Sequence, residues 1–240
     1  MKKIPFLLFI CLPFVGFGQF QSSIDLASGI FLSDIANFEN NVLTGPTSTI
    51  INEKYEPRPT SFFAVHYNHQ IKEKWYLKSG IRYSGMAYAT ENRKGLVWGS
   101  EIQDGLATGM GPIFDPSLPH EIQFIYKQYF LEIPILSRYE FKHKIFTPYI
   151  EAGLSPGYLV IGKTIRKTDL DTKEFDQNTA DVNKFQVTAS ISLGINFQVS
   201  PNSQGFLQPT FRQHIRTTYQ RADARAFSYG IEVGLRKQLK

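Results

Sequence analysis

The sequence predicts an all-β protein, an eight-stranded antiparallel up-and-down transmembrane β-barrel preceded by an N-terminal signal peptide. Three observations support this fold class. Eight segments alternate between apolar and polar residues with the period of two that strands show. The connections between these segments are alternately long and short. Aromatic residues form 14% of the chain, with 20 Phe and 12 Tyr against 2 Trp, and such a composition favours strands.

Residues 1–18 have the pattern of a cleaved secretory signal peptide, which leaves residues 19–240 as a single barrel domain. A pair of lysines precedes an apolar run of about 14 residues, which is too short to span a bilayer as a helix. Gly16 and Gly18 place small residues three positions and one position before the predicted cut. An uncleaved membrane anchor and a lipoprotein cut at Cys11 are less favoured alternatives, the second because it would halve the apolar run.

The strands are long, and their length indicates a membrane protein. Several exceed the usual strand of about 5–6 residues, whereas a tilted strand needs roughly 9–11 residues to cross the apolar band of a bilayer. The eight predicted strands cover residues 20–32, 61–71, 74–88, 122–141, 145–162, 184–200, 204–216 and 227–239.

The loop lengths predict the orientation of the barrel. Long connections cover residues 33–60, 89–121, 163–183 and 217–226, and only two or three residues separate the other neighbouring strands. Long outer loops and tight periplasmic turns are typical of outer-membrane barrels. We therefore expect an integral protein of the outer membrane, with both termini in the periplasm because the number of strands is even.

The alternation assigns an apolar and a polar face to each strand. In the last strand the odd-numbered positions from Tyr229 to Leu235 are apolar, and the even-numbered positions hold Gly, Glu and Ser. A soluble lipocalin-like barrel would have an apolar interior, but small residues with sparse charges suit a crowded lumen. The ten residue steps from Tyr129 to Tyr139 span roughly 25 Å along the membrane normal at a tilt near 40°, the height of the apolar band. We expect the apolar face to meet lipid.

One predicted strand carries a motif that resembles a known family. Residues 129–139, with the sequence YFLEIPILSRY, are similar to the Y-L-E-I-P-L-L-x-K-Y segment of the PorT-like outer-membrane β-barrel family. Residues 148–158, 192–197 and 229–235 resemble further strands of that family, so that the resemblance covers most of residues 20–239. It implies an eight-stranded barrel in a Gram-negative outer membrane and little chemistry. Pro134, within the motif, cannot donate to a strand ladder, and we expect a bulge or gap there.

Charged residues on the polar face predict an ion-pair network inside the lumen. Buried charges need partners, and eight strands enclose only enough room for side chains, so a structural plug is favoured over a path for ions or solutes. By strand order, Arg82, Arg138 and Arg236 are the cations nearest to the inward carboxylates. The predicted network consists of Asp25, Lys78, Arg82, Glu132, Arg138, Glu151, Arg212, Glu232 and Arg236.

Arginines around the last outer loop suggest contact with lipopolysaccharide. Arg216, Arg221 and Arg225 lie there, and guanidinium groups pair well with phosphate, although a solvated loop explains them equally well. The predicted partners are outer-membrane lipid, lipopolysaccharide and a protein bound through the outer loops. Nucleic acid is not expected, because the net charge is only +5 for the whole chain.

The sequence predicts no catalytic residue, metal or cofactor. His66 and His69 are three apart on one strand and point to opposite faces, and Asp169, Asp171 and Asp176 lack the glycine and glutamate of an EF-hand loop. Spacing places no Ser, His and Asp trio together. We expect a structural or interaction module, not an enzyme. A narrow channel or porin for small solutes is the first alternative, and a membrane enzyme on lipid or peptide substrates is the second.

Overall fold

The computed structural model describes residues 21–36, 55–95, 118–141, 146–176, 182–218 and 225–239. The predicted signal peptide lies outside these residues. Within them, no helix is long and apolar enough to cross a membrane. The strands are β1 (Ser22–Ala36), β2 (Tyr55–Lys72), β3 (Trp75–Thr90), β4 (Arg93–Lys94), β5 (Glu121–Glu132), β6 (Ile135–Glu140), β7 (Phe146–Thr168), β8 (Thr172–Asp176), β9 (Phe185–Ser200), β10 (Ser203–His214) and β11 (Arg225–Leu239).

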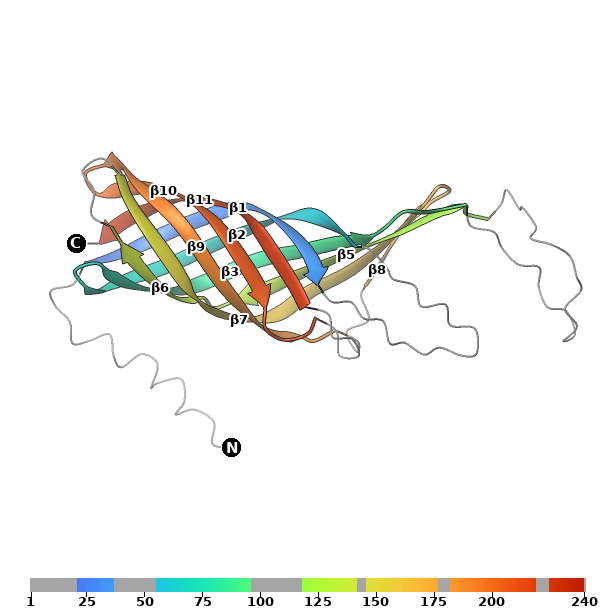
Figure 1. The fold of residues 1–240 in the computed structure, drawn as a ribbon, viewed down its shortest axis with the longest axis horizontal. Helices are drawn as coiled ribbons and strands as arrows, with labels where there is room; N and C mark the ends of the chain where they lie inside the picture. The colour runs from blue at the N-terminus through green and yellow to red at the C-terminus, as the bar shows by residue number, and fades with distance from the viewer. Residues whose placement is uncertain are drawn as a thin grey trace, which may run out of the picture.

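The strands form one antiparallel sheet that closes into a barrel (Figure 1). The order runs from β2 through β1, β11, β10, β9 and β7 to β5, β6 and β3, and β3 returns to β2. The first and last strands pair along their whole length, from Ser22 opposite Leu239 to Ala36 opposite Arg225. Closure leaves no unpaired strand edge in the barrel wall, as a bilayer requires. The predicted fold class is confirmed.

The barrel has eight strands in its wall because β5 and β6 act as one strand interrupted by a proline. β5 ends at Glu132 and β6 begins at Ile135, and both pair with β3 and β7. Pro134 has no N–H to donate to the ladder, and at the break the N–H of Ile133 donates to the carbonyl of Pro156 at 2.9 Å. The expected gap at Pro134 is confirmed.

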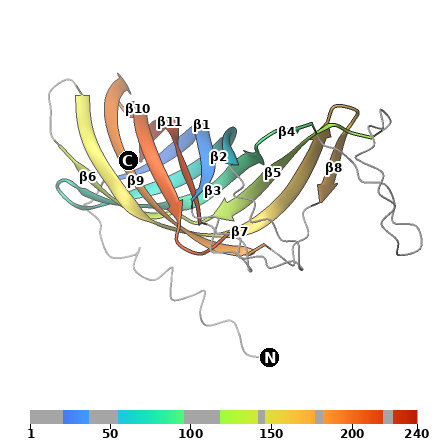
Figure 2. The ribbon, with the colours of Figure 1, turned by 45° about the vertical axis from the view of Figure 1, so that its right-hand side comes forward.

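The strands extend further than the sequence predicts at the end of the barrel opposite the termini. The predicted loop 163–183 is wrong in its first half, because β7 continues to Thr168 and the chain returns as β8. β4, residues 121–127 of β5, residues 163–168 of β7, and β8 project beyond the barrel as the extension sheet (Figure 2). Parts of three further predicted loops also belong to strands, namely 33–60, 89–121 and 217–226.

The outside of the barrel is apolar with aromatic rings near both edges. Ile30, Ile81 and Leu193 are about three-fifths exposed on this surface. Aromatic pairs lie towards the end of the termini (Trp75 with Tyr139 at 5.0 Å) and towards the opposite end (Tyr83 with Tyr129 at 5.6 Å, Phe211 with Phe227 at 6.3 Å). An apolar band between two aromatic girdles is typical of barrels that span a lipid bilayer.

The lumen is filled by side chains and is not uniformly small and polar. Six apolar residues cluster among the buried charges at its middle, and a second cluster fills the lumen near the extension sheet. We call this second cluster the apolar cap. The middle cluster is Ala27, Phe31, Phe62, Ala64, Tyr149 and Phe206. The apolar cap is Ile35, Met86, Tyr88, Phe130, Leu159, Val182 and Ala226.

Candidate functional site: the lumenal charge network

The structure places all nine charged residues of the predicted network inside the lumen. Each is no more than 5% exposed. They come from six of the eight wall strands, with β5 and β6 counted as one. Each occupies the inward position that alternation gives it, and the outward neighbours of Asp25, Glu132 and Glu232 are exposed and apolar.

The first group of ion pairs lies towards the termini. Glu151 on β7 accepts hydrogen bonds from Lys78 Nζ at 3.1 Å and from Arg138 Nε at 2.8 Å. Asp25 on β1 accepts from Arg236 Nε at 2.8 Å and from a terminal nitrogen of the same guanidinium at 3.2 Å. The Asp25 pair joins β1 to β11, so it ties the first strand to the last.

Glu140 belongs to this group, although it is not among the charged residues expected in the lumen. Its carboxylate accepts from Arg236 at 2.9 Å and from the Asn196 amide at 3.1 Å, and it lies 3.9 Å from Arg138. Glu140 is two residues after Arg138 on β6 and therefore shares its inward face. Applying the alternation to the end of that strand would have found it.

The second group lies closer to the apolar cap. Glu132 accepts hydrogen bonds from the Arg212 guanidinium and from Ser84 Oγ, the latter at 2.8 Å. Arg82 lies 2.7 Å from Glu232. The expected neighbours of the inward carboxylates are therefore only partly right. Arg138 does face Glu151 and Arg82 does face Glu232, but Glu132 takes Arg212, from a strand 80 positions away.

With Glu140 included, the described lumen is electrically balanced. Five cations face five carboxylates. Charges buried at this depth are tolerated only in well-placed pairs, and every carboxylate of the set has a cation within 3.1 Å. The cations are Lys78, Arg82, Arg138, Arg212 and Arg236, and the carboxylates are Asp25, Glu132, Glu140, Glu151 and Glu232.

Three aromatic rings support the network by lying over glycines of neighbouring strands. Each ring faces a glycine directly opposite in the ladder, where any side chain would collide with it. A Cβ at Gly194 would lie 2.2 Å from Cζ of Tyr149. The three pairs are Phe62 with Gly29, Tyr149 with Gly194, and Phe206 with Gly234.

A cation of the network lies over each of these rings. Cations are attracted to the faces of aromatic rings, more strongly when water is excluded. Each unit is therefore a stack of glycine, ring and cation, and the cation in turn contacts a carboxylate. The distances to the ring centroids are 3.9 Å for Arg82 over Phe62, 4.2 Å for Arg138 over Tyr149, and 5.8 Å for Lys78 over Phe206.

A neutral bridge connects the two groups of ion pairs. The Tyr149 hydroxyl donates to the side-chain oxygen of Gln208 at 2.6 Å, and the amide nitrogen of Gln208 donates to Glu232 at 3.0 Å. Because Tyr149 lies under Arg138, the bridge links the group near the termini to the group near the apolar cap. The arrangement connects strands across the lumen.

Further polar residues are buried beside the network, among them two on β2 that lack partners among the described residues. His66 and Asn68 on β2 are each 1% exposed, and their side-chain polar atoms have no hydrogen-bond partner in the described structure. His69 lies on the opposite face, 3.4 Å from Ser22 Oγ. His214 is buried in the lumen, with its ring 5.4 Å from Phe130.

The arginines predicted to contact lipopolysaccharide lie apart from the network. Arg216 and Arg225 are exposed where β10 and β11 end near the extension sheet, and Arg221 lies outside the described residues. The Arg216 guanidinium is 6.0 Å from the ring of Phe185 and donates to the carbonyl of that residue at 3.5 Å. Arg216 and Arg225 therefore stand above the apolar band of the wall.

The aspartates near the tip of the extension sheet hold turns and ion pairs. Asp169 accepts from the backbone N–H groups of His120 at 3.0 Å and Glu121 at 3.3 Å. Desolvation opposes ionisation of Asp169, but these hydrogen bonds prevail and lower its pKa. Asp171 pairs with Lys173 at 3.0 Å. No group of three or more metal-ligating side chains occurs within the described ranges.

Several solved outer-membrane proteins are similar to this chain. Neisserial surface protein A is 12% identical, with 91% of this chain and 97% of that chain covered and a TM-score of 0.43. Ail, the attachment invasion locus protein of Yersinia pestis, is 12% identical, with coverage of 90% and 99% and a TM-score of 0.38. OprG from Pseudomonas aeruginosa is 7% identical, with coverage of 91% and 96% and a TM-score of 0.43.

A comparison with protein families identifies the chain. No curated protein sequence matches it. The family model described as an outer membrane protein beta-barrel domain matches residues 17–213, which include seven of the eight wall strands almost entirely. The closed barrel, its apolar outer surface and this match agree, and the chain belongs to the outer membrane protein beta-barrel domain family.

Proposed function

We propose that this chain is a PorT-like member of its family that acts as a closed structural or interaction module and not as an enzyme. In this proposal the extension sheet and long loops face outside the cell, and both termini face the periplasm. The observation that carries the proposal is the filled lumen. The ion-pair network with its aromatic stacks fills the middle of the barrel interior, and the apolar cap fills the part near the extension sheet.

The arrangement of the connections supports the orientation. At the end of the termini the chain turns within Glu73–Lys74 and Pro201–Asn202. The extension sheet lies at the opposite end (Figure 1). Short turns on the periplasmic side and long excursions outside are the arrangement found in outer-membrane barrels.

The extension sheet supports a role in interaction. β8 is exposed throughout, and its outer edge has no partner strand among the described residues. An exposed edge or face outside the membrane can recruit a protein partner. Lipopolysaccharide is the second proposed partner, at Arg216, Arg221 and Arg225, because guanidinium groups bind phosphate in two-pronged geometry.

A narrow channel is the second candidate function, and one observation favours it. The buried polar atoms of His66 and Asn68 lack protein partners, and groups of this kind in folded proteins are commonly served by internal water. A chain of water past these residues would still meet the apolar cap, which is why we favour the closed barrel.

Conductance separates these two functions. The purified, folded protein is reconstituted in planar bilayers, and the folded fraction is checked by its faster migration on unheated gels. We expect no stable single-channel steps, because paired charges and the apolar cap fill the lumen. Reproducible steps from the unmutated protein would overturn the closed barrel and favour the channel.

A further inference from the structure

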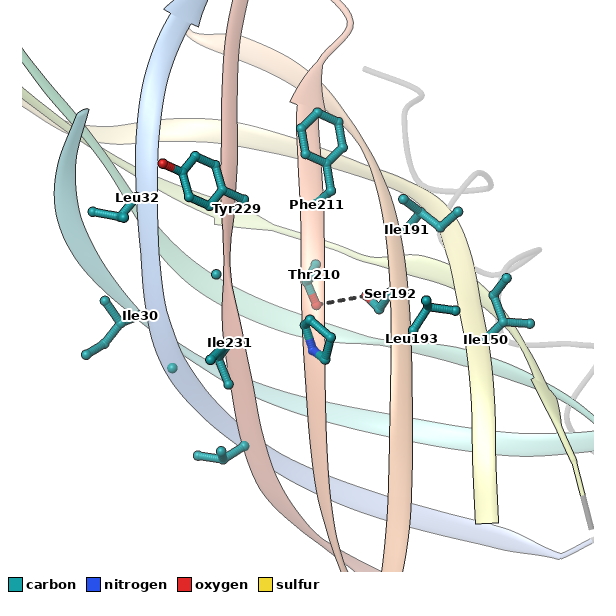
Figure 3. Close-up of a pocket in the computed structure, with 14 residues that line it drawn as sticks. Ile30, Leu32, Ile150, Ile191, Ser192, Leu193, Thr210, Phe211, Tyr229 and Ile231 are labelled. Atoms are coloured by element: carbon teal, nitrogen blue, oxygen red, sulfur yellow. Dashed lines mark hydrogen bonds between the residues drawn. The ribbon is translucent and has the colours of Figure 1, made fainter. Parts of the chain in front are cut away.

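The outer surface of the barrel has a large apolar hollow on one wall. It lies over β1, β11, β10 and β9, with a contribution from β7, and has a volume of about 1060 Å³ (Figure 3). Ile30, Ile231 and Leu193 contribute long apolar side chains to it, and Phe211 and Tyr229 stand together towards the extension end. A hollow of this size is at the upper end of the range for ligand pockets.

Compact residues form the middle of the hollow. Pro209 places a short ring on the outward face of β10, opposite Ile231 in the ladder. The only hydroxyls besides Tyr229 among its lining residues are those of Ser192 and Thr210, and these hydrogen-bond to each other at 2.9 Å. The middle of the hollow therefore offers apolar contact without an unsatisfied polar group, which suits a hydrocarbon chain.

Cations stand above the extension end of the same wall. Arg225 is on the outward face of β11, four residues beyond the ring of Tyr229, and Arg216 and Lys184 are exposed at the ends of β10 and β9. Among the residues of this wall that the structure describes, one carboxylate, Asp34 on β1, lies at the same level as these three cations. The wall therefore joins a positive rim to an apolar hollow, and this charge complements an anionic head group with hydrocarbon chains.

We propose that this wall binds a phosphate-bearing acylated glycolipid of the outer leaflet, the lipid A portion of lipopolysaccharide. An acyl chain lies in the hollow, and a phosphate lies at Arg216 and Arg225. The assignment to the outer leaflet rests on the orientation given in the proposed function. The binding of phosphate at the rim and of an acyl chain in the hollow does not depend on that orientation. Guanidinium groups at the rim hold the phosphate by charge-assisted hydrogen bonds.

The binding of lipid A tests this proposal directly. The folded barrel in zwitterionic detergent is titrated with lipid A and with enzymatically dephosphorylated lipid A that has the same chains, and bound complexes are counted by native mass spectrometry. We expect the dephosphorylated lipid to bind about tenfold more weakly, a difference typical of lost charge-assisted contacts. Equal binding of the two lipids would overturn the phosphate site.

Variants of the wall test each half of the site. Pro209→Phe fills the hollow and restores a ladder N–H, so it removes no buried group, and Leu207→Phe is its control on the same outward face of β10 but outside the hollow. We expect about tenfold weaker binding of lipid A for Pro209→Phe and none of this loss for Leu207→Phe. Arg216→Gln with Arg225→Gln should remove the preference for phosphate, and Lys167→Gln on the extension sheet should keep it.

Three outcomes would overturn the site. The two phenylalanine variants could bind lipid A equally, the double glutamine variant could keep the preference for phosphate, or Pro209→Phe alone could abolish a dimer seen without lipid. The last outcome would assign the hollow to a second copy of the chain. None of these measurements involves conductance, so a conducting barrel would contradict the proposed function and leave the lipid site intact.

Discussion

Single glycines determine where the cations of the lumen can lie. Tyr149 covers Gly194, and Arg138 lies over the same ring. Because the stack starts from a residue without a side chain, the ring can approach the strand backbone and leave room for the guanidinium. A methyl group at the glycine would move the ring towards the cation.

We expect Gly194→Ala to lower the stability of the barrel by about 1–3 kcal/mol, the usual cost of inserting atoms into a packed interior. The new Cβ would lie 2.2 Å from Tyr149 Cζ and displace the ring from beneath Arg138. The midpoint of the heat-induced change in gel migration measures the effect. Ser28→Ala, on the outward face of β1, is the control. Equal midpoints for the two alanine variants would show that the ring relaxes without cost.

Glu132→Ala should cost more, about 3–5 kcal/mol, because Arg212 would remain buried without its carboxylate. The same gel assay measures the loss, and Glu174→Ala in β8 is the control, since Glu174 pairs with Lys163 in an exposed position. If the two variants unfold at the same temperature, Glu132 does not contribute to a buried network. Removing both Glu132 and Arg212 should restore part of the stability.

At the scale of elements, the sequence predicts strands well where their two faces meet different surroundings. β9 and β10 alternate over most of their length between exposed, mainly apolar residues and buried, mainly polar ones, and their predicted bounds differ from the structure by at most two residues. The extension sheet has solvent near both faces, so Lys163, Thr164 and Arg166 carry no apolar alternation. The signal on which the prediction relies is therefore absent where the prediction fails.

The tip of the extension sheet should depend on the ionised form of Asp169. Its carboxylate accepts from the N–H groups of His120 and Glu121, which lower its pKa against desolvation. Because the pKa of Asp169 is lower in the folded state than in the unfolded state, the ionised carboxylate stabilises the tip at pH values above the unfolded pKa, which is about 3.9. This stabilisation is lost as the pH falls through the pKa of the folded state.

Hydrogen exchange at the His120 and Glu121 amides measures this dependence. At neutral pH we expect faster exchange in Asp169→Ala than in the unmutated protein, and at a pH below the folded pKa the two should exchange equally. Asp176→Ala, at the end of β8, should behave like the unmutated protein at both values. A difference that persists at low pH would contradict a role for the carboxylate charge.

At the scale of the whole molecule, the sequence identifies which charges enter the lumen but not how they pair. Alternation alone places residues such as Asp25 and Arg236 inside. Asp25 and Arg236 are direct partners in the β1–β11 ladder, so their pairing follows once the register is known. Arg212 with Glu132 and Arg82 with Glu232 join strands that are not neighbours in the sheet, and these pairs depend on the closed barrel. The rings over the glycines follow no polar pattern either, since Phe62 and Phe206 are apolar residues on the lumenal face.

The orientation of the barrel can be tested with single cysteines. We expect Thr172→Cys in β8 to react with an impermeant maleimide on intact cells, and Glu73→Cys and Asn202→Cys in the short turns to react only after the outer membrane is opened. Labelling of Glu73→Cys with protection of Thr172→Cys would reverse the orientation. The only native cysteine is Cys11, within the predicted signal peptide, so background labelling should be low.

The distance along the chain between paired charges has a consequence for assembly. Asp25 and Arg236 are 211 positions apart, and Arg82 and Glu232 are 150 positions apart. A nascent sheet that lacks its last strand therefore holds Asp25 and Arg82 without these partners, and desolvating them would be costly. Zipping β11 onto β1 neutralises both at once. Closure of the wall and neutralisation of these lumenal charges therefore occur together. An incompletely assembled barrel is destabilised by unpaired buried charges as well as by its open strand edges.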